Sequence, residues 1–398
     1  MKLVLLIAAC AACQRTERSP DPGSATPPPG GRPAPAAAYR VPEDQARPTP
    51  PLPDPLPGKR RDMAAIVGGA ARIAIADLDG DGHPELVLVD AEAIRVVDGG
   101  GHELARAPVA GGIEVLSAAD LDGDHRAELV AGWGLSREHR VARARVTLHR
   151  LDGARLVEEL VAAPATTRQD VAAVIARGAA LLIAYFDSTY SVTKVTATHG
   201  AAGWSTGDPV VIRMATSWAI GDLDGDRQPE VVVGRLYGDA KDRDGDAFVL
   251  APGGRRRALP TLRGVQGLAV ADTDGDGRDE IFLGDGWHQD YGQRARGQLT
   301  WVRLVDGELR SEVIEDTPGQ YTIWQILVAD VDGDGKPEIV TRGSHYVRVY
   351  RRSGERWRGL TIAGAARDLA IGDLDGTGNA ILIAGERSEL VSLRGVAW

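Results

Sequence analysis

The stretch Asp77-Leu-Asp-Gly-Asp-Gly-His-Pro-Glu85 recurs along the chain, and this repeat decides the fold. Apolar residues four and two positions before it, Ile73 and Ile75, alternate with their neighbours, and the apolar run Leu86–Val89 follows it. Alternation with a period of two predicts strands with one face in a core. The unit is therefore strand, acidic loop, strand. Further intact copies begin at Asp120, Asp222, Asp272 and Asp330, and a sixth, Asp373-Leu-Asp-Gly-Thr-Gly-Asn-Ala-Ile381, has lost two acids.

Each unit predicts a four-stranded sheet, because two more strand-like segments, Ala93–Val97 and Glu103–Pro108, complete the first one. The second and third copies lie about twice as far apart as the others, so we expect a unit without an acidic loop between them, and Val171–Phe186 fits it. Seven such units predict an all-β, seven-bladed β-propeller over residues 59–398. The rival architectures are an open solenoid and two stacked β-sandwiches.

The chain ends predict how the ring closes. The last unit contains three strands and ends with Glu389–Leu393, so it lacks an outer strand. We expect Met63–Val67, which precedes the first unit, to supply that strand and remove a free sheet edge.

The acidic loops predict calcium sites. Intact copies place carboxylates at positions 1, 3, 5 and 9 and Gly at position 4, and the carbonyl of position 7 can add an oxygen. Six or seven hard oxygens, with Glu at position 9 bidentate, suit Ca²⁺ rather than zinc or copper. An EF-hand needs its Glu at position 12, where these loops have none. The predicted ligands are Asp77, Asp79, Asp81, His83 and Glu85; Asp120, Asp122, Asp124, Arg126 and Glu128; Asp222, Asp224, Asp226, Gln228 and Glu230; Asp272, Asp274, Asp276, Arg278 and Glu280; Asp330, Asp332, Asp334, Lys336 and Glu338.

Charge supports about five calcium ions. The formal net charge is -10, and five divalent ions would cancel it. The same sign disfavours nucleic acid as a partner. The alternative, that the loops are plain acidic turns, does not explain four carboxylates at a fixed spacing in five copies. The Asp373 loop is a doubtful site, and Asp242–Asp246 imitates the motif without its Glu.

The repeated unit resembles the FG-GAP or VCBS-type repeat of integrin α-subunit propellers and bacterial surface proteins. The resemblance covers residues 62–398, and it implies calcium in hairpins on one face of a seven-bladed propeller and ligand binding on the other. Departures are the unit without an acidic loop, Glu rather than Asp at position 9, and His125 and Arg227 at the Gly position 6.

The first 58 residues predict an anchor and a tether. Residues 1–13 have the pattern of a secretory signal, and Ile7-Ala-Ala-Cys10 resembles a bacterial lipobox. We expect lipidation at Cys10, with Cys13 as the alternative, and a lipoprotein outside the cytoplasm, at the outer membrane or cell surface; a soluble secreted protein is the other interpretation. Residues 14–58 contain 14 of the 23 prolines and predict an extended tether.

The turns on the face opposite the acidic loops carry aromatic residues, which suit a protein or glycan ligand. The alternative is that these rings cover the ends of the blades and pack on their own loops. We therefore expect a monomeric binding, adhesion or scaffold module without a catalytic residue. The alternative is a calcium-dependent polysaccharide lyase, in which His288 and Asp290 would act as acid and base. The candidate ligand-face residues are Trp133, Tyr237, Trp287, His288, Tyr291 and Tyr321.

Overall fold

A computed structural model shows the fold of the chain. It describes residues 58–109, 112–134, 144–164, 169–177, 180–187, 191–200, 203–235, 246–251, 254–260, 264–285, 296–318, 323–343, 345–354 and 356–396. The predicted signal, with Cys10 and Cys13, and all of the predicted tether except Gly58 lie outside these ranges. Within them, no helix is both long and apolar enough to cross a membrane.

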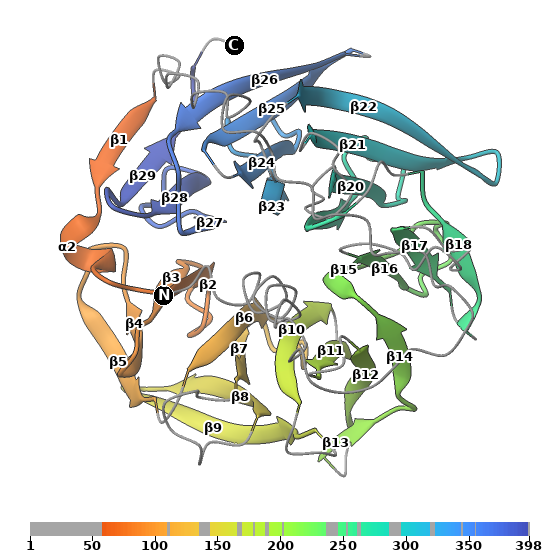
Figure 1. Ribbon diagram of the computed structural model, residues 1–398. Coiled ribbons are helices and arrows are strands. Elements are labelled where there is room, and N and C mark those ends of the chain that lie inside the picture. Colours follow the sequence, from red (N-terminus) through yellow and green to blue (C-terminus); the bar gives the residue numbers. More distant parts are fainter. Residues whose placement is uncertain are drawn as a thin grey trace, which may run out of the picture.

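Seven antiparallel sheets stand as blades around a central axis (Figure 1), which confirms the predicted seven-bladed propeller. In each ordinary blade the first strand lies at the centre and the fourth at the perimeter. Blade 1 consists of β2 (Arg72–Ala76), β3 (Glu85–Val89), β4 (Ala93–Val97) and β5 (Glu103–Pro108); blade 2 of β6 (Ile113–Ala119), β7 (Glu128–Trp133), β8 (Arg145–Asp152) and β9 (Arg155–Ala162); blade 4 of β15 (Ala215–Gly221), β16 (Glu230–Arg235), β17 (Ala247–Leu250) and β18 (Arg256–Ala258); blade 5 of β19 (Gly267–Ala271), β20 (Glu280–Asp285), β21 (Arg296–Val305) and β22 (Glu308–Pro318); blade 6 of β23 (Ile323–Ala329), β24 (Glu338–Gly343), β25 (Val347–Ser353) and β26 (Arg356–Ala363).

Blade 3 is the unit predicted between the second and third acidic loops. Its first two strands pair up to Arg177 opposite Ala180, so their connection is too short for a nine-residue acidic loop. Its outer part is divided between two strands, which both pair with the third strand. The strands are β10 (Asp170–Arg177), β11 (Ala180–Phe186), β12 (Ser191–Gly200), β13 (Gly203–Thr206) and β14 (Val210–Arg213).

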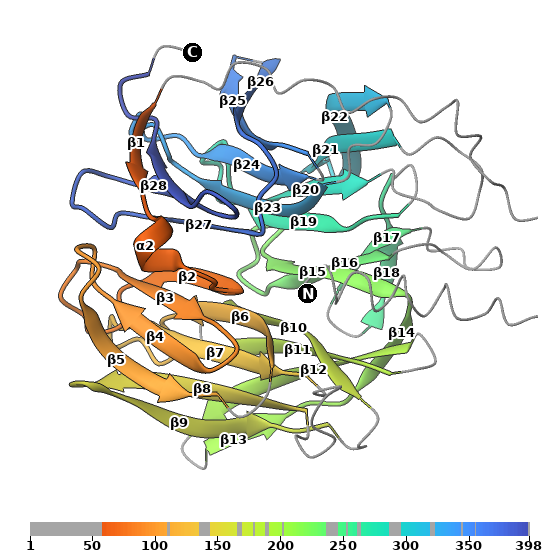
Figure 2. The same ribbon diagram turned by 60° about the vertical axis from the view of Figure 1, so that its left-hand side comes forward.

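An N-terminal strand closes the ring, but the predicted segment was wrong. Blade 7 takes β1 (Lys59–Asp62) as its outer strand beside β29, and Figure 2 shows this strand against the C-terminal blade. Met63–Val67 instead contains a helical turn, α2 (Ala64–Val67), because Met63 and Val67 are four residues apart and both enter the core between blades 1 and 7. The closing strand is charged and exposed, so it carries no apolar pattern. The other strands of blade 7 are β27 (Asp368–Gly372), β28 (Ala380–Ala384) and β29 (Glu389–Ser392).

The core is divided among the interfaces between blades. The described residues form seven buried apolar clusters, and each joins two neighbouring blades, including blades 7 and 1. Trp218, for example, packs between blades 3 and 4 and is 6% exposed, as its position in the strand pattern predicts. Because the first strands all run the same way along the axis, the acidic loops that follow them gather on one face of the ring.

Candidate metal centre

The first aspartate of each acidic loop shapes the loop backbone. In blade 1, Asp77 Oδ1 accepts the N–H of Gly80 at 2.7 Å and its Oδ2 accepts the N–H of Gly82 at 2.9 Å. The other four intact loops repeat both hydrogen bonds with Asp120, Asp222, Asp272 and Asp330. One side chain therefore holds two turns of the loop in every copy.

The departures from glycine at position 6 leave the loop conformation unchanged. His125 and Arg227 adopt φ angles of 70° and 68°, in the left-handed region where Gly82 has 84°. This region costs a residue with a side chain roughly 1 kcal/mol. Both residues still donate their N–H groups to the first aspartate of their loops.

The glutamate at position 9 closes the base of each loop and is buried in all five. Its Oε2 accepts the N–H of position 2, as Glu85 does from Leu78 at 2.7 Å and Glu338 does from Val331 at 3.0 Å. The same bond joins Glu128 to Leu121, Glu230 to Leu223 and Glu280 to Thr273. Because Oε2 is engaged in this bond, Oε1 is the more available oxygen for a cation, and bidentate binding by the glutamate stays a prediction.

The loops bring together most, but not all, of the predicted carboxylates. Oxygens of positions 1, 3 and 9 lie within 4.8 Å of one another in all five loops. Among the described residues, position 5 lies within this distance in blade 5, through Asp276, and outside it in the other four loops, where cation binding by position 5 stays a prediction. In all five loops Oδ1 of the position 5 aspartate accepts the N–H of position 7, so this bond does not account for the difference between blade 5 and the others. Cation binding by the carbonyls of His83, Arg126, Gln228, Arg278 and Lys336 stays a prediction.

The clusters carry an electrostatic cost. Burial, with the neighbouring loop aspartates adding to it, raises the pKa of Glu85 and of Glu338 to about 7 and that of Glu280 to about 6. The pKa values of Glu128 and Glu230 are raised for the same reasons. Glu338 is 0% exposed, so water does not reach its Oε1, and this oxygen has no hydrogen-bond partner. A bound cation would compensate such an oxygen, and an all-oxygen donor set fits Ca²⁺ or another hard cation.

Neighbouring loops contact each other in pairs. The N–H of Ala127 donates to the Asp77 carbonyl at 2.6 Å, and the N–H of Asp279 donates to the Asp222 carbonyl at 2.7 Å. The Asp373 loop, which forms no carboxylate cluster within the described residues, donates the Asn379 side-chain amide to the Asp330 carbonyl at 2.9 Å. Blades 1 and 2, 4 and 5, and 6 and 7 are therefore linked through their loops.

The predicted ligand face is supported at none of its described positions. Trp133 ends β7, is 2% exposed and donates its indole N–H to Thr147 Oγ1 at 2.7 Å, so its inclusion in a ligand face was wrong. An aromatic residue next to a predicted loop can still be the last core residue of the strand. Tyr237, Trp287, His288, Tyr291 and Tyr321 lie outside the described residues. Of Asp242–Asp246 only the last is described, and Asp246 is 8% exposed and accepts the N–H of Gly264.

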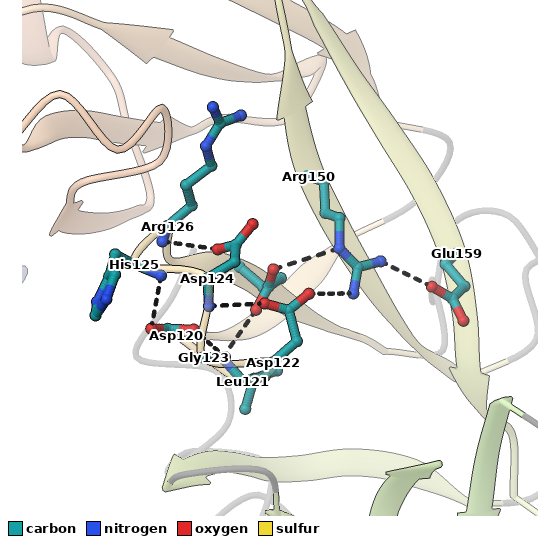
Figure 3. A network of polar contacts seen from close by, with 10 residues as sticks. Asp120, Leu121, Asp122, Gly123, Asp124, His125, Arg126, Arg150 and Glu159 are labelled. Atoms are coloured by element: carbon teal, nitrogen blue, oxygen red, sulfur yellow. Dashed lines mark hydrogen bonds and ion pairs between the residues drawn. The ribbon is translucent and has the colours of Figure 1, made fainter. Parts of the chain in front are cut away.

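Sequence reasoning missed the arginines that pair with loop aspartates. Arg352 of β25 lies 3.9 Å from Asp274 in the loop of the neighbouring blade 5. Two others enter the loop of their own blade: Arg150 of β8 reaches the Asp120 loop (Figure 3), and Arg351 of β25 reaches the Asp330 loop. They follow their glutamates at unequal distances along the chain, because the segments between the strands differ in length. Strand pairing reveals their shared position, whereas spacing in the sequence does not.

A second charged group lies at the opposite end of the strands, near the axis. Asp368, at the start of β27, is 8% exposed and accepts the N–H of Ile73 in blade 1 at 3.2 Å. Burial raises the pKa of Asp368 and the charges of Arg72 and Arg342 oppose the shift. This contact links the last blade to the first one on the face away from the acidic loops.

Comparison with known proteins agrees with the loop geometry. A family model described as an FG-GAP-like repeat matches residues 77–131, 272–341 and 330–383. The chain carries FG-GAP-like repeats. These matches contain the intact loops of blades 1, 2, 5 and 6 and the altered loop of blade 7.

Solved structures share the propeller fold. One is the crystal structure of BP39L lectin from Burkholderia pseudomallei, with a TM-score of 0.57 and 14% sequence identity over 83% of this chain and 99% of the lectin chain. At this identity the likeness concerns the fold alone. No curated protein matches the chain.

The raised glutamate pKa values predict an unusual pH dependence. In metal-free protein, the folded state keeps protons on Glu85 and Glu338 that the unfolded chain releases near pH 4.5. These two glutamates therefore contribute to the free energy of unfolding in full below pH 4.5, and their contribution is lost as the pH rises to about 7. Urea unfolding of chelator-stripped protein across this range measures it. The double variant Glu85→Gln, Glu338→Gln should lose much of the dependence, and an equal slope in both proteins contradicts the assignment.

Removal of one buried charge should have opposite effects with and without metal. Glu338→Gln keeps an acceptor for the Val331 N–H and removes a charge beside two aspartates, so the metal-free protein should gain about 1 kcal/mol in unfolding free energy. The same variant should gain less from calcium than the parent protein, because it loses a ligand charge. Denaturant unfolding with and without calcium measures both values. The exposed Glu103→Gln is the control and should change neither; a destabilised metal-free Glu338→Gln protein would contradict the cation-site interpretation.

Proposed function

We propose that this protein is a calcium-stabilised binding module, a propeller that presents a ligand face and is held outside the cytoplasm by an N-terminal lipid. The observation that carries the calcium part is the repeated cluster of three or four carboxylates around a buried glutamate. Repulsion among these groups is strong in the absence of a counter-charge, and calcium supplies two positive charges and accepts the hard oxygens that each loop offers.

The binding part has weaker support than the fold. FG-GAP-like repeats and a structural likeness to a protein named a lectin favour a binding module, and a glycan or a protein surface is the proposed ligand class. The calcium loops occupy one face, so the opposite face, which carries the Asp368 group, is the proposed ligand surface. We propose a monomer, since the ring closes on itself through β1 and β29.

The proposed cellular location of the protein rests on its N-terminal sequence. The signal-like residues 1–13 and the proline-rich residues 14–58 support a lipoprotein at the outer membrane or cell surface, lipidated at Cys10. With roughly 3.1 Å per residue, such a tether extends the propeller on the order of 100 Å from the membrane.

A glycan array probed with the full chain tests the binding proposal. The chain should retain one class of glycan in calcium, lose it in EDTA, and release no unsaturated, ultraviolet-absorbing product from acidic polysaccharides. A parallel pull-down from envelope extract, identified by mass spectrometry, covers a protein ligand. Product release would favour the lyase alternative. Retention that EDTA leaves intact, together with an unchanged fold, would contradict the calcium requirement.

Fatty-acid labelling in a bacterial host tests the anchor separately. Cys10→Ala should abolish labelling and release the protein from the membrane fraction, whereas Cys13→Ala should leave both unchanged. The reverse pattern moves the lipid to Cys13, and labelling in neither protein contradicts the anchor.

A further inference from the structure

One residue of the third strand stands beside the loop glutamate in each blade that has an intact acidic loop. In blade 2, Leu129 pairs with His149, which places the next residue, Arg150, beside Glu128. The pairings of the other blades identify the residue at the same position. It is Asp98 in blade 1, Ala251 in blade 4, Arg303 in blade 5 and Arg351 in blade 6.

Arg150 enters the carboxylate cluster of its own blade. Its Nε lies 3.3 Å from Glu128 Oε1, and its Nη2 lies 3.6 Å from Asp122 Oδ2. The far side of the guanidinium donates to Glu159 Oε2 on the outer strand at 3.0 Å, which holds the side chain in this direction (Figure 3). Two of the three clustered carboxylates, including the glutamate oxygen left for a cation, thus already face a positive charge.

The arginine at the same position in blade 5 has a different partner. The guanidinium of Arg303 stacks on Trp301, 4.4 Å from the ring centroid. In that loop four carboxylates converge, and a cavity of about 260 Å³ lies beside Asp274 and Asp276 and is also lined by Arg303. Within the described residues, the nearest ion pair to the cluster is the longer one of Arg352 with Asp274, at 3.9 Å. The blade 5 loop therefore has room and charge for a cation.

Blade 6 is intermediate between these two cases. Arg351 pairs with Asp332 at 3.2 Å and also with Asp334, but Glu338 Oε1 has no hydrogen-bond partner. Arg351 therefore neutralises part of the charge of the blade 6 loop, and Glu338 Oε1 remains as a buried oxygen that a metal ion could bind. Asp98 and Ala251 bring no positive charge to the loops of blades 1 and 4.

We propose that Arg150 is the built-in counter-cation of the blade 2 loop. It neutralises there the charge that calcium neutralises in blades 1, 4 and 5, so this loop keeps its shape without metal and binds calcium last, when Arg150 is displaced. The inference rests on the proposed calcium function and assigns an order to its sites. The Arg150 side chain is 35% exposed, and displacing its ion pairs with Asp122 and the buried Glu128 weakens the blade 2 site on the order of tenfold relative to the open loops.

A metal-independent loop in blade 2 has a structural consequence for blade 1. Ala127 of this loop donates its N–H to the Asp77 carbonyl at 2.6 Å. The Arg126 side chain covers Gly80, where an added Cβ would lie 2.9 Å from it. Arg150 thereby supports the neighbouring loop when calcium is scarce.

Calorimetric titration of the chelator-stripped full chain with Ca²⁺ tests the proposal. The parent protein should show one site class weaker than the rest, and Glu128→Gln should remove that class, which assigns it to blade 2. Arg150→Gln should strengthen the weak class on the order of tenfold. Arg303→Gln is the matched control from blade 5 and should leave the titration unchanged.

The converse variant tests the same idea without disturbing blade 2. Ala251→Arg places an arginine beside Glu230 and should move one further site into the weak class. This result supports the proposal even if Arg150→Gln does not fold. A weak class that neither Arg150→Gln nor Ala251→Arg changes, or the absence of a weak class in the parent protein, overturns the role of Arg150 and leaves the calcium function standing. No calcium binding by the parent protein overturns both.

Discussion

Mutual repulsion of carboxylates is the constraint on which the rest of this structure depends. Five loops hold acidic oxygens within 4.8 Å of one another, and each loop uses its backbone N–H groups to fix the aspartates and to anchor the glutamate. These hydrogen bonds set the geometry but add no net positive charge. In the proposed account a cation balances the charge of each loop: a metal ion in the open loops and, in blade 2, the guanidinium of Arg150.

The acidic loops lie at one end of the interfaces between blades, around the ring. Seven apolar interfaces carry the core, and none of them is confined to one blade. The acidic loops cap one end of these interfaces and contact each other in pairs, so neighbouring blades are joined through their loops. At the other end, Asp368 links blade 7 to blade 1. In the proposed function, cations stabilise one face of the ring and a ligand binds the other.

Local sequence patterns predicted the features that recur at a fixed spacing, such as blades and loops. They did not predict contacts between residues that lie far apart in the sequence. The repeat from Asp77 to Glu85 predicted seven blades, the blade without an acidic loop at Val171–Phe186, and the clustering of carboxylates from positions 1, 3 and 9. It did not show that Asp81 lies outside its cluster while Asp276 lies inside, because both make the same bond to the N–H of position 7. The closing strand was missed since Lys59–Asp62 is charged throughout, and Trp133 was misplaced since its burial depends on the neighbouring strand. The contact between Arg150 and Glu128 could not be predicted from the sequence, because strand pairing rather than a fixed spacing brings the two residues together.

Thermal unfolding of the chain in EDTA and in millimolar calcium tests the central claim most directly. Ligands that bind only the folded state raise its stability, and several calcium sites should raise the midpoint on the order of 10 °C. Magnesium at the same concentration should raise it less, because Mg²⁺ requires a stricter octahedral geometry. Unfolding curves that coincide in EDTA and calcium would contradict the account, because the acidic loops would then be stable without any added cation.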